Sequence, residues 1–168
     1  MTPMLEPILS EFREEAATTK RMLERVPADK LSWKPHEKSM SLGQLAVHVA
    51  NIPGSIAKLV QGEEFDVSTA NFVPTPPNNL EEVHTAFHQS IQAAEDYLQS
   101  VTEQKVLGPW RLTAGGKELF TKPRVAIIRT IMLNHWYHHR GQLSVYLRLL
   151  NVAIPVIYGR SADENPFA

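Results

Sequence analysis

The residues with the clearest capacity for chemistry in this sequence are its histidines. The chain has seven histidines and no cysteine, so imidazole and carboxylate groups are the metal ligands that it can offer. His135 and His139 lie four residues apart in the segment HWYHHRGQL. In a helix this spacing places two side chains one turn apart on the same face, where both can bind one metal ion.

The residues around this pair predict which way it points. At about 100° per residue, the positions within about 60° of His135 are mostly apolar, and His139 lies at about 40°. These positions are Ile128, Ile131, Met132, Gln142, Tyr146, Leu149 and Leu150. We therefore expect both histidines to face the interior of a helical protein. A single histidine on an apolar face is more often a hydrogen-bonded core residue than a ligand, but two stacked histidines without a nearby carboxylate favour a metal.

A third ligand is predicted from another helical segment, in which His48 lies between Leu45 and Ile52 on the apolar face. Three protein nitrogens with an open position are typical of catalytic rather than structural zinc sites. Zinc or nickel is the favoured ion, with manganese or iron as alternatives, because nitrogen ligands alone do not choose among these metals. No catalytic residue is assigned beyond this metal site.

Other histidines are weaker candidates. His138 lies at the edge of the apolar face, so we expect it to support the site as a neighbour rather than as a ligand. His84 and His88 also have a four-residue spacing, but each follows an apolar-face residue and is expected on a solvated flank.

Several further residues near the histidine pair carry structural expectations. Gln142 is a polar group on the apolar face and is expected to orient a ligand or solvent. Arg140 is expected to be a surface or interface charge. Trp136, Tyr137 and Gly141 lie away from the apolar face and suggest close packing against a second subunit or an outer loop of the same chain.

The elements that must position these residues are four helices, predicted from apolar residues recurring every three or four positions. They are expected at residues 5–26, 41–62, 80–101 and 123–151. Ser41 and Gln44 have the spacing of a capping box at the start of the second helix. Pro53 lies inside that helix, where it removes a backbone hydrogen bond to Val49 and predicts a kink after His48.

The connections complete the predicted fold. Residues 63–79 contain three prolines and are expected to form a long crossover loop. Residues 109–122 have two short alternating runs around Gly115–Gly116, which predict a small hairpin or else a loop. The proline-containing end, from residue 154, is expected to run extended over the body and across a site entrance. The sequence thus predicts one all-α domain over residues 1–168, a four-helix bundle with these additions.

Composition excludes several classes of function. The formal net charge is −1, with 21% charged residues and scattered basic ones, so neither nucleic acid nor a membrane surface is an expected partner. No apolar run approaches the roughly 20 residues that span a bilayer. The beginning MTPMLEPILSEFREE becomes acidic at once, unlike a signal peptide. A soluble, cytoplasmic protein is therefore expected.

At HWYHHRGQL the sequence resembles the DinB-like family, the damage-inducible proteins that include YfiT-type metal-dependent hydrolases. The segments LSWKP, SLGQLAVHVA and IPVIYGRSADE are also similar to landmarks of that family, so the resemblance spans nearly the whole chain. It implies a four-helix bundle, commonly dimeric, with a metal bound by three histidines. On this sequence these are His48, His135 and His139.

The resemblance also limits the expected function. Some relatives are thiol S-transferases that use bacillithiol, glutathione or mycothiol, and one branch isomerises maleylpyruvate. We therefore expect a metal-dependent enzyme of the S-transferase or hydrolase type that acts on a small molecule, uses a low-molecular-weight thiol in the first case, and forms a homodimer. The alternatives are a non-catalytic metal- or ligand-binding protein of the stress response, and a structural dimer whose histidines hold no metal.

Overall fold

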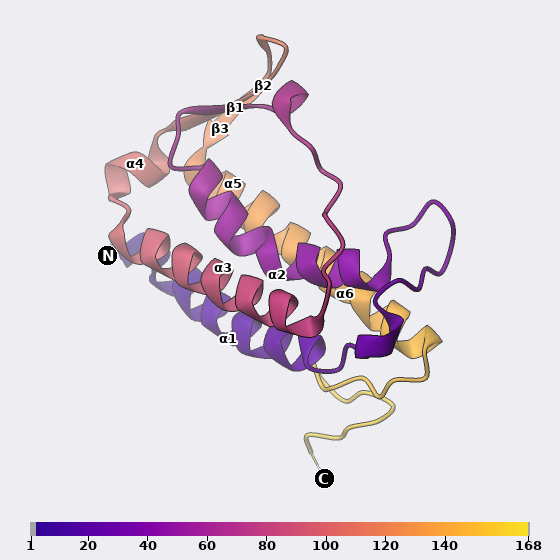
Figure 1. Ribbon diagram of the computed structural model, residues 1–168. Helices are drawn as coiled ribbons and strands as arrows, with labels where there is room; N and C mark the ends of the chain where they lie inside the picture. Colours follow the sequence, from indigo (N-terminus) through magenta and orange to yellow (C-terminus); the bar gives the residue numbers. More distant parts are fainter. Residues whose placement is uncertain (1–2, 168) are drawn as a thin grey trace.

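The computed structural model describes residues 3–167 and has four long helical segments arranged as a bundle (Figure 1). The first three are α1 (Glu6–Leu23), α2 (Leu42–Leu59) and α3 (Leu80–Ser100). The fourth is a run of three consecutive helical elements, α5 (Arg124–Ile127), a π-helix (Ile128–Asn134) and α6 (His135–Leu149). The prediction of four helices is confirmed, although the last one is not a uniform α-helix.

Local sequence signals explain where α2 and α3 begin. The Ser41 hydroxyl accepts a hydrogen bond from the Gln44 amide at 3.2 Å, and the Gln44 side chain accepts one from the Ser41 amide at 2.9 Å, so the predicted capping box is present. Asn79 caps α3 by accepting from the amide of Glu82 at 3.0 Å. Each cap satisfies amides that have no partner within the first turn of a helix.

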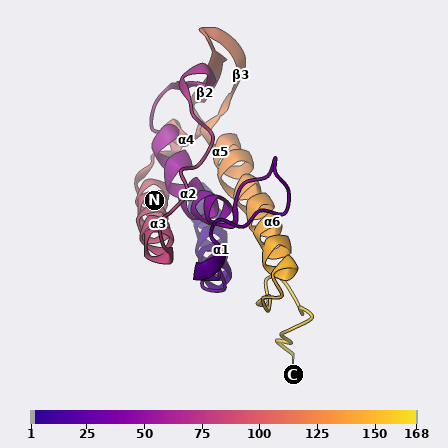
Figure 2. The same cartoon turned by 45° about the vertical axis from the view of Figure 1, so that its right-hand side comes forward.

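Helix α2 lies between α3 on one side and α6 on the other (Figures 1 and 2). It approaches α3 closely at Gly54, where an added Cβ would lie 2.7 Å from the Ser90 Cα. Its buried residues are apolar, and Leu45, Ala46 and Val49 are fully buried. Because α2 contacts α6 directly, a side chain on its α6-facing side can meet side chains from the fourth helical segment.

The expectation of an all-α fold is wrong in one respect, because a three-stranded sheet stands at one end of the bundle (Figure 1). The predicted hairpin is present as β2 (Pro109–Ala114) and antiparallel β3 (Lys117–Pro123). Its turn residues Gly115 and Gly116 have φ values of 57° and 80°, which glycine adopts without strain.

Strand β1 (Glu64–Asp66) pairs in parallel with β2 and comes from the segment that we expected to be a loop. A 3₁₀ turn follows it at Val67–Thr69. The Asp66 carboxylate accepts hydrogen bonds from the amides of Gly115 and Gly116, at 3.0 and 3.1 Å, and so fastens this segment to the hairpin turn. A three-residue strand whose partner is more than forty residues away leaves no local signal in the sequence, which is why the prediction missed it.

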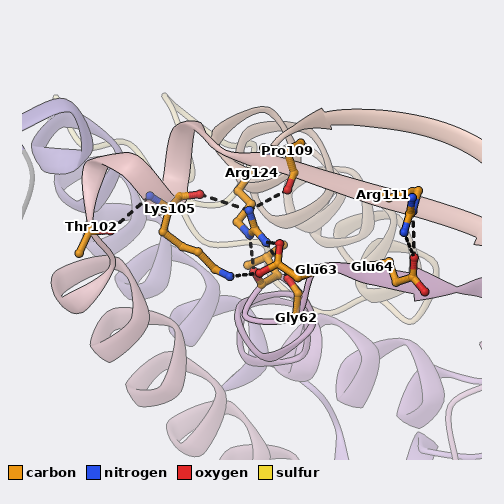
Figure 3. A network of polar contacts seen from close by, with 9 residues as sticks. Gly62, Glu63, Glu64, Thr102, Lys105, Pro109, Arg111 and Arg124 are labelled. Carbon is orange, nitrogen blue, oxygen red and sulfur yellow. Dashed lines mark hydrogen bonds and ion pairs between the residues drawn. The ribbon is translucent and has the colours of Figure 1, made fainter.

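A buried arginine joins the sheet to the helices (Figure 3). Arg124 is 1% exposed. Its guanidinium donates to the backbone carbonyls of Val60, Gly62, Lys105 and Pro109, and it forms an ion pair with Glu63. These partners come from the end of α2, the short helix α4 (Glu103–Leu107) and the start of β2, so one side chain holds three segments together.

The end of the chain has neither helix nor strand over residues 152–167, as expected, and it packs across the ends of α1 and α6. Glu164 forms an ion pair with Arg25 at 2.8 Å and accepts from the Val156 amide at 2.8 Å. Asp163 forms an ion pair with Arg148. Among residues 3–167, no helix combines the length and the apolar character needed to cross a membrane.

Candidate metal centre

The three histidines selected from the sequence meet between α2 and α6. One ring nitrogen from each of His48, His135 and His139 can be chosen so that all three lie within 4.8 Å of one another. The ring centroid of His48 lies 5.4 Å from that of His135 and 4.5 Å from that of His139. Within residues 3–167 this is the single group of three or more histidine or carboxylate side chains close enough to share one ion.

A hydrogen bond fixes which nitrogen of His139 carries the lone pair. The side-chain oxygen of Gln142 lies 2.7 Å from Nδ1 of His139. Because this oxygen can only accept, Nδ1 is the donor and Nε2 of the neutral ring keeps its lone pair. The Nε2 atoms of His139 and His135 lie 2.7 Å apart, and the His135 ring is also hydrogen-bonded to the backbone of Ile131.

The environment favours the uncharged form of all three rings. Burial is the largest cause that lowers the pKa of His48, and together with the nearby His139 and His135 it brings that pKa to about 4. Burial is also the largest cause that lowers the pKa of His135 and of His139, although the hydrogen bond to Gln142 acts in the opposite direction on His139. Neutral imidazole is the form that binds a metal, because the ligating nitrogen must be deprotonated.

The donor set therefore fits a divalent first-row ion. The Nε2 lone pair of His139 points at Nε2 of His135, and an ion bound by both nitrogens would take the place of the proton that they can share in the metal-free protein. Metal–nitrogen bonds of about 2.0–2.1 Å require only a small adjustment of rings whose nitrogens already lie within 4.8 Å. Because the three nitrogens are neutral, the net charge of the occupied site would be that of the ion. Three ligands also fill only part of its coordination sphere.

Pro53 explains how α2 and α6 are brought into register at this site. A proline has no amide hydrogen, so the Val49 carbonyl has no helical donor. The indole of Trp136 donates to that carbonyl at 2.9 Å, and the indole is fully buried. Val49 follows His48 in the sequence and Trp136 follows His135, so this hydrogen bond places the two histidines on facing helices at the same level.

The predicted orientation of the last helix is wrong in detail. The core-facing residues of α6 are Trp136, Arg140, Leu143 and Leu147. Leu149, which we expected to be buried, is 57% exposed, and Gln142 is exposed. The histidines are half-buried at the flank of the helix, towards α2, rather than at the centre of its buried face.

The π-helix before His135 is part of the physical reason for this difference. A count at 3.6 residues per turn assumes a uniform α-helix, whereas the wider turns of Ile128–Asn134 change the angular position of every residue relative to those beyond them. The second part is that α6 has two neighbours, α1 and α2. Its apolar residues are therefore divided between two contact surfaces, so a prediction based on a single apolar face cannot place all of them.

Arg140, expected at the surface, is 2% exposed. Its guanidinium forms an ion pair with Glu15 at 2.5 Å and donates to the hydroxyls of Thr19 and Tyr158, at 3.1 and 2.5 Å. Helix α1 also packs against Trp136, whose ring centroid lies 5.6 Å from that of Phe12. Thus α1 of the same chain, rather than a second subunit or an outer loop, covers Trp136.

The other histidines lie outside the three-nitrogen group, as predicted. His138 is exposed, with its ring centroid 4.9 Å from that of His139. His84 and His88 are not part of the group; His88 is exposed on α3, as expected, whereas His84 is half-buried.

A cavity of about 560 Å³ lies beside the histidines, and His48 and His135 form part of its wall. The other walls come from α2, the sheet, the π-helix and the segment after the 3₁₀ turn, and they include Ile56, Phe65, Leu112, Ile131, Phe72 and Val73. The C-terminal tail contributes no residue to this wall, so the expectation that it crosses the site entrance is wrong. Four separate parts of the chain form the cavity, which is why the sequence alone did not indicate it.

The fold and this site define a helical-bundle protein with a three-histidine group beside an apolar cavity. The chain belongs to the DinB family, whose model matches residues 1–165. It is 24% identical over 171 residues to the uncharacterized protein YrdA of Bacillus subtilis, covering 98% of this chain and 93% of that protein.

Two crystal structures of DinB-like proteins have the same fold. One, from Bacillus cereus ATCC 10987, has a TM-score of 0.69 and 21% sequence identity, and the match covers 89% of this chain and 95% of that one. The other, YjoA from Bacillus subtilis, has a TM-score of 0.69 and 20% identity, with 93% and 100% of the two chains covered. The predicted resemblance to the DinB-like family is confirmed.

Proposed function

We propose that residues 1–168 form one DinB-family domain that acts as a metal-dependent enzyme, a thiol S-transferase or a hydrolase, with a divalent ion held by His48, His135 and His139. The observation that carries this proposal is the convergence of three half-buried imidazoles, two of which, His48 and His135, line an open cavity. An ion there would have both protein ligands and a space in which a small molecule can approach it.

The ion, when bound, would supply a Lewis-acid position that favours loss of a proton from a thiol or from water. The chain supplies the rest. Gln142 holds the tautomer of His139, and the backbone of Ile131 holds the ring of His135. Such hydrogen bonds orient ligating histidines and tune their basicity. The apolar walls of the cavity exclude water and orient the substrate.

The S-transferase version is favoured by what surrounds the site. No carboxylate lines the cavity within the described chain, so a hydrolase would lack the usual general base of metal-dependent hydrolysis. The chain has no cysteine, and the sulfur nucleophile would therefore come from a low-molecular-weight thiol. Zinc or nickel suits three imidazoles, with manganese or iron as alternatives.

The absence of a carboxylate from the described cavity lining also supports a second candidate, a non-catalytic protein of the stress response that binds a metal or a ligand. In this version the cavity holds its ligand without converting it. The two candidates share the metal site and differ only in turnover, so one set of experiments separates them. A homodimer in solution is part of both.

The metal site is tested by titrating untagged, chelator-treated protein with zinc and with nickel and by measuring the metal content of the dialysed protein. We expect one ion per chain for the wild type. His48→Ala should bind at least about a hundredfold more weakly, because it removes one of three ligands. His84→Ala, which changes a histidine outside the group, should bind as the wild type does. Equal binding by all three proteins would refute the proposed site.

Turnover is tested with the metal-loaded protein, candidate thiols and a chlorinated aromatic acceptor. The S-transferase version expects consumption of the thiol that depends on the metal and is lost in His48→Ala. Stoichiometric metal without turnover of any thiol or ester substrate would support the non-catalytic candidate instead.

A further inference from the structure

The cavity beside His48 and His135 has no aspartate, glutamate, lysine or arginine among its lining residues, all of which lie in the described part of the chain. Its polar side chains other than the two histidines are Asn51, Ser55 and Asn71. A carboxylate or ammonium group that entered the cavity would give up hydration without gaining an opposite charge, which is costly. Away from the histidines, where a bound divalent ion would supply positive charge, the lining therefore discriminates against charged groups of either sign.

Three of the polar side chains lie along one wall, whereas His135 comes from α6 and Asn71 from the segment between the sheet and α3. His48, Asn51 and Ser55 are spaced three and four residues apart on α2, so they lie on one face of that helix. The opposite wall comes from the sheet and presents Phe65, Leu112 and other apolar side chains. A ligand with one polar group and an apolar body would thus place the polar group towards α2 and the body towards the sheet.

The rim of the cavity gives a second indication of an apolar ligand. Phe72 and Val73 line the cavity and are nevertheless 68% and 67% exposed. They belong to the segment that crosses from the sheet to α3, which is attached to α2 by a hydrogen bond from the Gln44 side chain to the Pro74 carbonyl at 3.0 Å. An apolar ligand would remove part of this surface from water, which favours its binding.

We propose that this cavity is the binding site for an uncharged small molecule with an aromatic or aliphatic body and one polar group directed at the histidines. The inference rests on the proposed function, since it names the substrate class of that metal site. The volume of about 560 Å³ suits a molecule of one to three rings. If the co-substrate is a thiol that carries carboxylates, its charged part lies outside the cavity.

The test uses metal-free protein, so that direct coordination does not contribute. The uncharged fluorophore N-phenyl-1-naphthylamine reports binding by its increase in emission. It is then displaced by three compounds with the same ring system, 1-naphthalenemethanol, 1-naphthoate and 1-naphthylmethylammonium. We expect the displacement curves to give a dissociation constant for the uncharged alcohol at least about tenfold lower than for either ion. Only the ions give up hydration that no opposite charge in the cavity replaces.

A charged substitution in the wall makes the test specific to this cavity. Ser55 is exposed to the cavity on α2, so Ser55→Lys adds a cation there without disturbing the core. It should weaken the alcohol and strengthen 1-naphthoate, reversing the order of these two compounds. Ser10→Lys, an identical change at an exposed position of α1, should leave the order as in the wild type. Circular dichroism of both variants checks that they are folded.

The failure of this inference differs from the failure of the proposed function. If the wild type binds zinc but not the probe, or if 1-naphthoate or the ammonium compound binds as tightly as the alcohol, the substrate class is wrong and the metal site remains. If the alcohol is preferred but zinc does not bind, the cavity assignment holds as a ligand site and the metal-dependent function is wrong. An order of compounds that Ser55→Lys does not change would place the binding elsewhere and overturn the inference.

Discussion

Arg124→Met is the substitution whose effect on stability follows most directly from the structure. The guanidinium is 1% exposed and donates to four backbone carbonyls while pairing with Glu63 (Figure 3). Methionine keeps most of the buried apolar stem and removes every one of these donors. The substitution therefore isolates the polar contribution of the side chain that joins α2, α4 and the sheet.

The magnitude can be estimated from the groups left without partners. A buried carbonyl that loses its donor costs about 1–3 kcal/mol if water does not replace the donor. The Val60 carbonyl is buried and the hydrogen bonds to Lys105 and Pro109 are part-buried, whereas Gly62 and Glu63 are exposed and can be solvated. We therefore expect a loss of about 2–4 kcal/mol in the free energy of unfolding, because the Val60 carbonyl loses its donor completely and the part-buried carbonyls lose theirs in part. For a chain of this size the Tm falls by roughly 4–16 °C.

The assay is equilibrium unfolding in urea, followed by circular dichroism and by tryptophan fluorescence. Arg111→Met is the matched control, since Arg111 and Glu64 form an ion pair in the same region with side chains that are each 50% exposed. Such exposed pairs contribute about 0–1 kcal/mol. A loss below about 1 kcal/mol in Arg124→Met, or one equal to that of Arg111→Met, would refute the idea that the buried guanidinium holds this junction together.

Two further predictions concern the histidine site. Burial, with the neighbouring His139 and His135, lowers the pKa of His48 from 6.5 to about 4, so the unfolded chain binds the proton more readily than the folded chain. The free energy of unfolding of the metal-free protein should therefore fall as the pH drops from about 6.5 towards 4. Because the ring is only partly buried, we expect this group to contribute about 1–2 kcal/mol to the change in the free energy of unfolding between pH 7.5 and 5.0. Urea unfolding of the wild type and of His48→Gln at the two pH values measures this contribution. Identical pH dependence in the two proteins would contradict it. Trp136→Phe should leave the Val49 carbonyl without a donor and cost about 2–4 kcal/mol including the lost ring volume, and it should also weaken zinc binding by about tenfold, because the same hydrogen bond aligns His48 with His135. Phe12→Leu, a packing change in contact with Trp136 that keeps this hydrogen bond, should lower stability without changing zinc affinity, and an equal loss of affinity in both variants would contradict the alignment role.

The sequence determined the features that depend on neighbouring residues. The capping box at Ser41 and the hairpin turn at Gly115–Gly116 are set by groups within four residues of one another, so their signals survive without any tertiary information. The same is true of His135 and His139, whose four-residue spacing is a property of a single helix. Helix boundaries and two of the three candidate ligands could therefore be predicted.

His48 was identified from its place on an apolar face and from the family resemblance, but its distance from the α6 histidines depends on helix packing. The sequence shows that Pro53 leaves the Val49 carbonyl without a helical donor. It does not show which side chain supplies the missing hydrogen bond. Only the folded chain shows that Trp136 donates to Val49 and so sets the level at which α2 and α6 meet.

The tertiary structure alone decided which side of the last helix is buried, and therefore that Arg140 is buried and Leu149 is exposed. It also decided the pairing of β1 with β2 and the cavity that the sheet closes over the histidines. Each of these depends on contacts between residues far apart in the chain, and the free energy of such contacts comes from the burial of surfaces that local spacing does not specify.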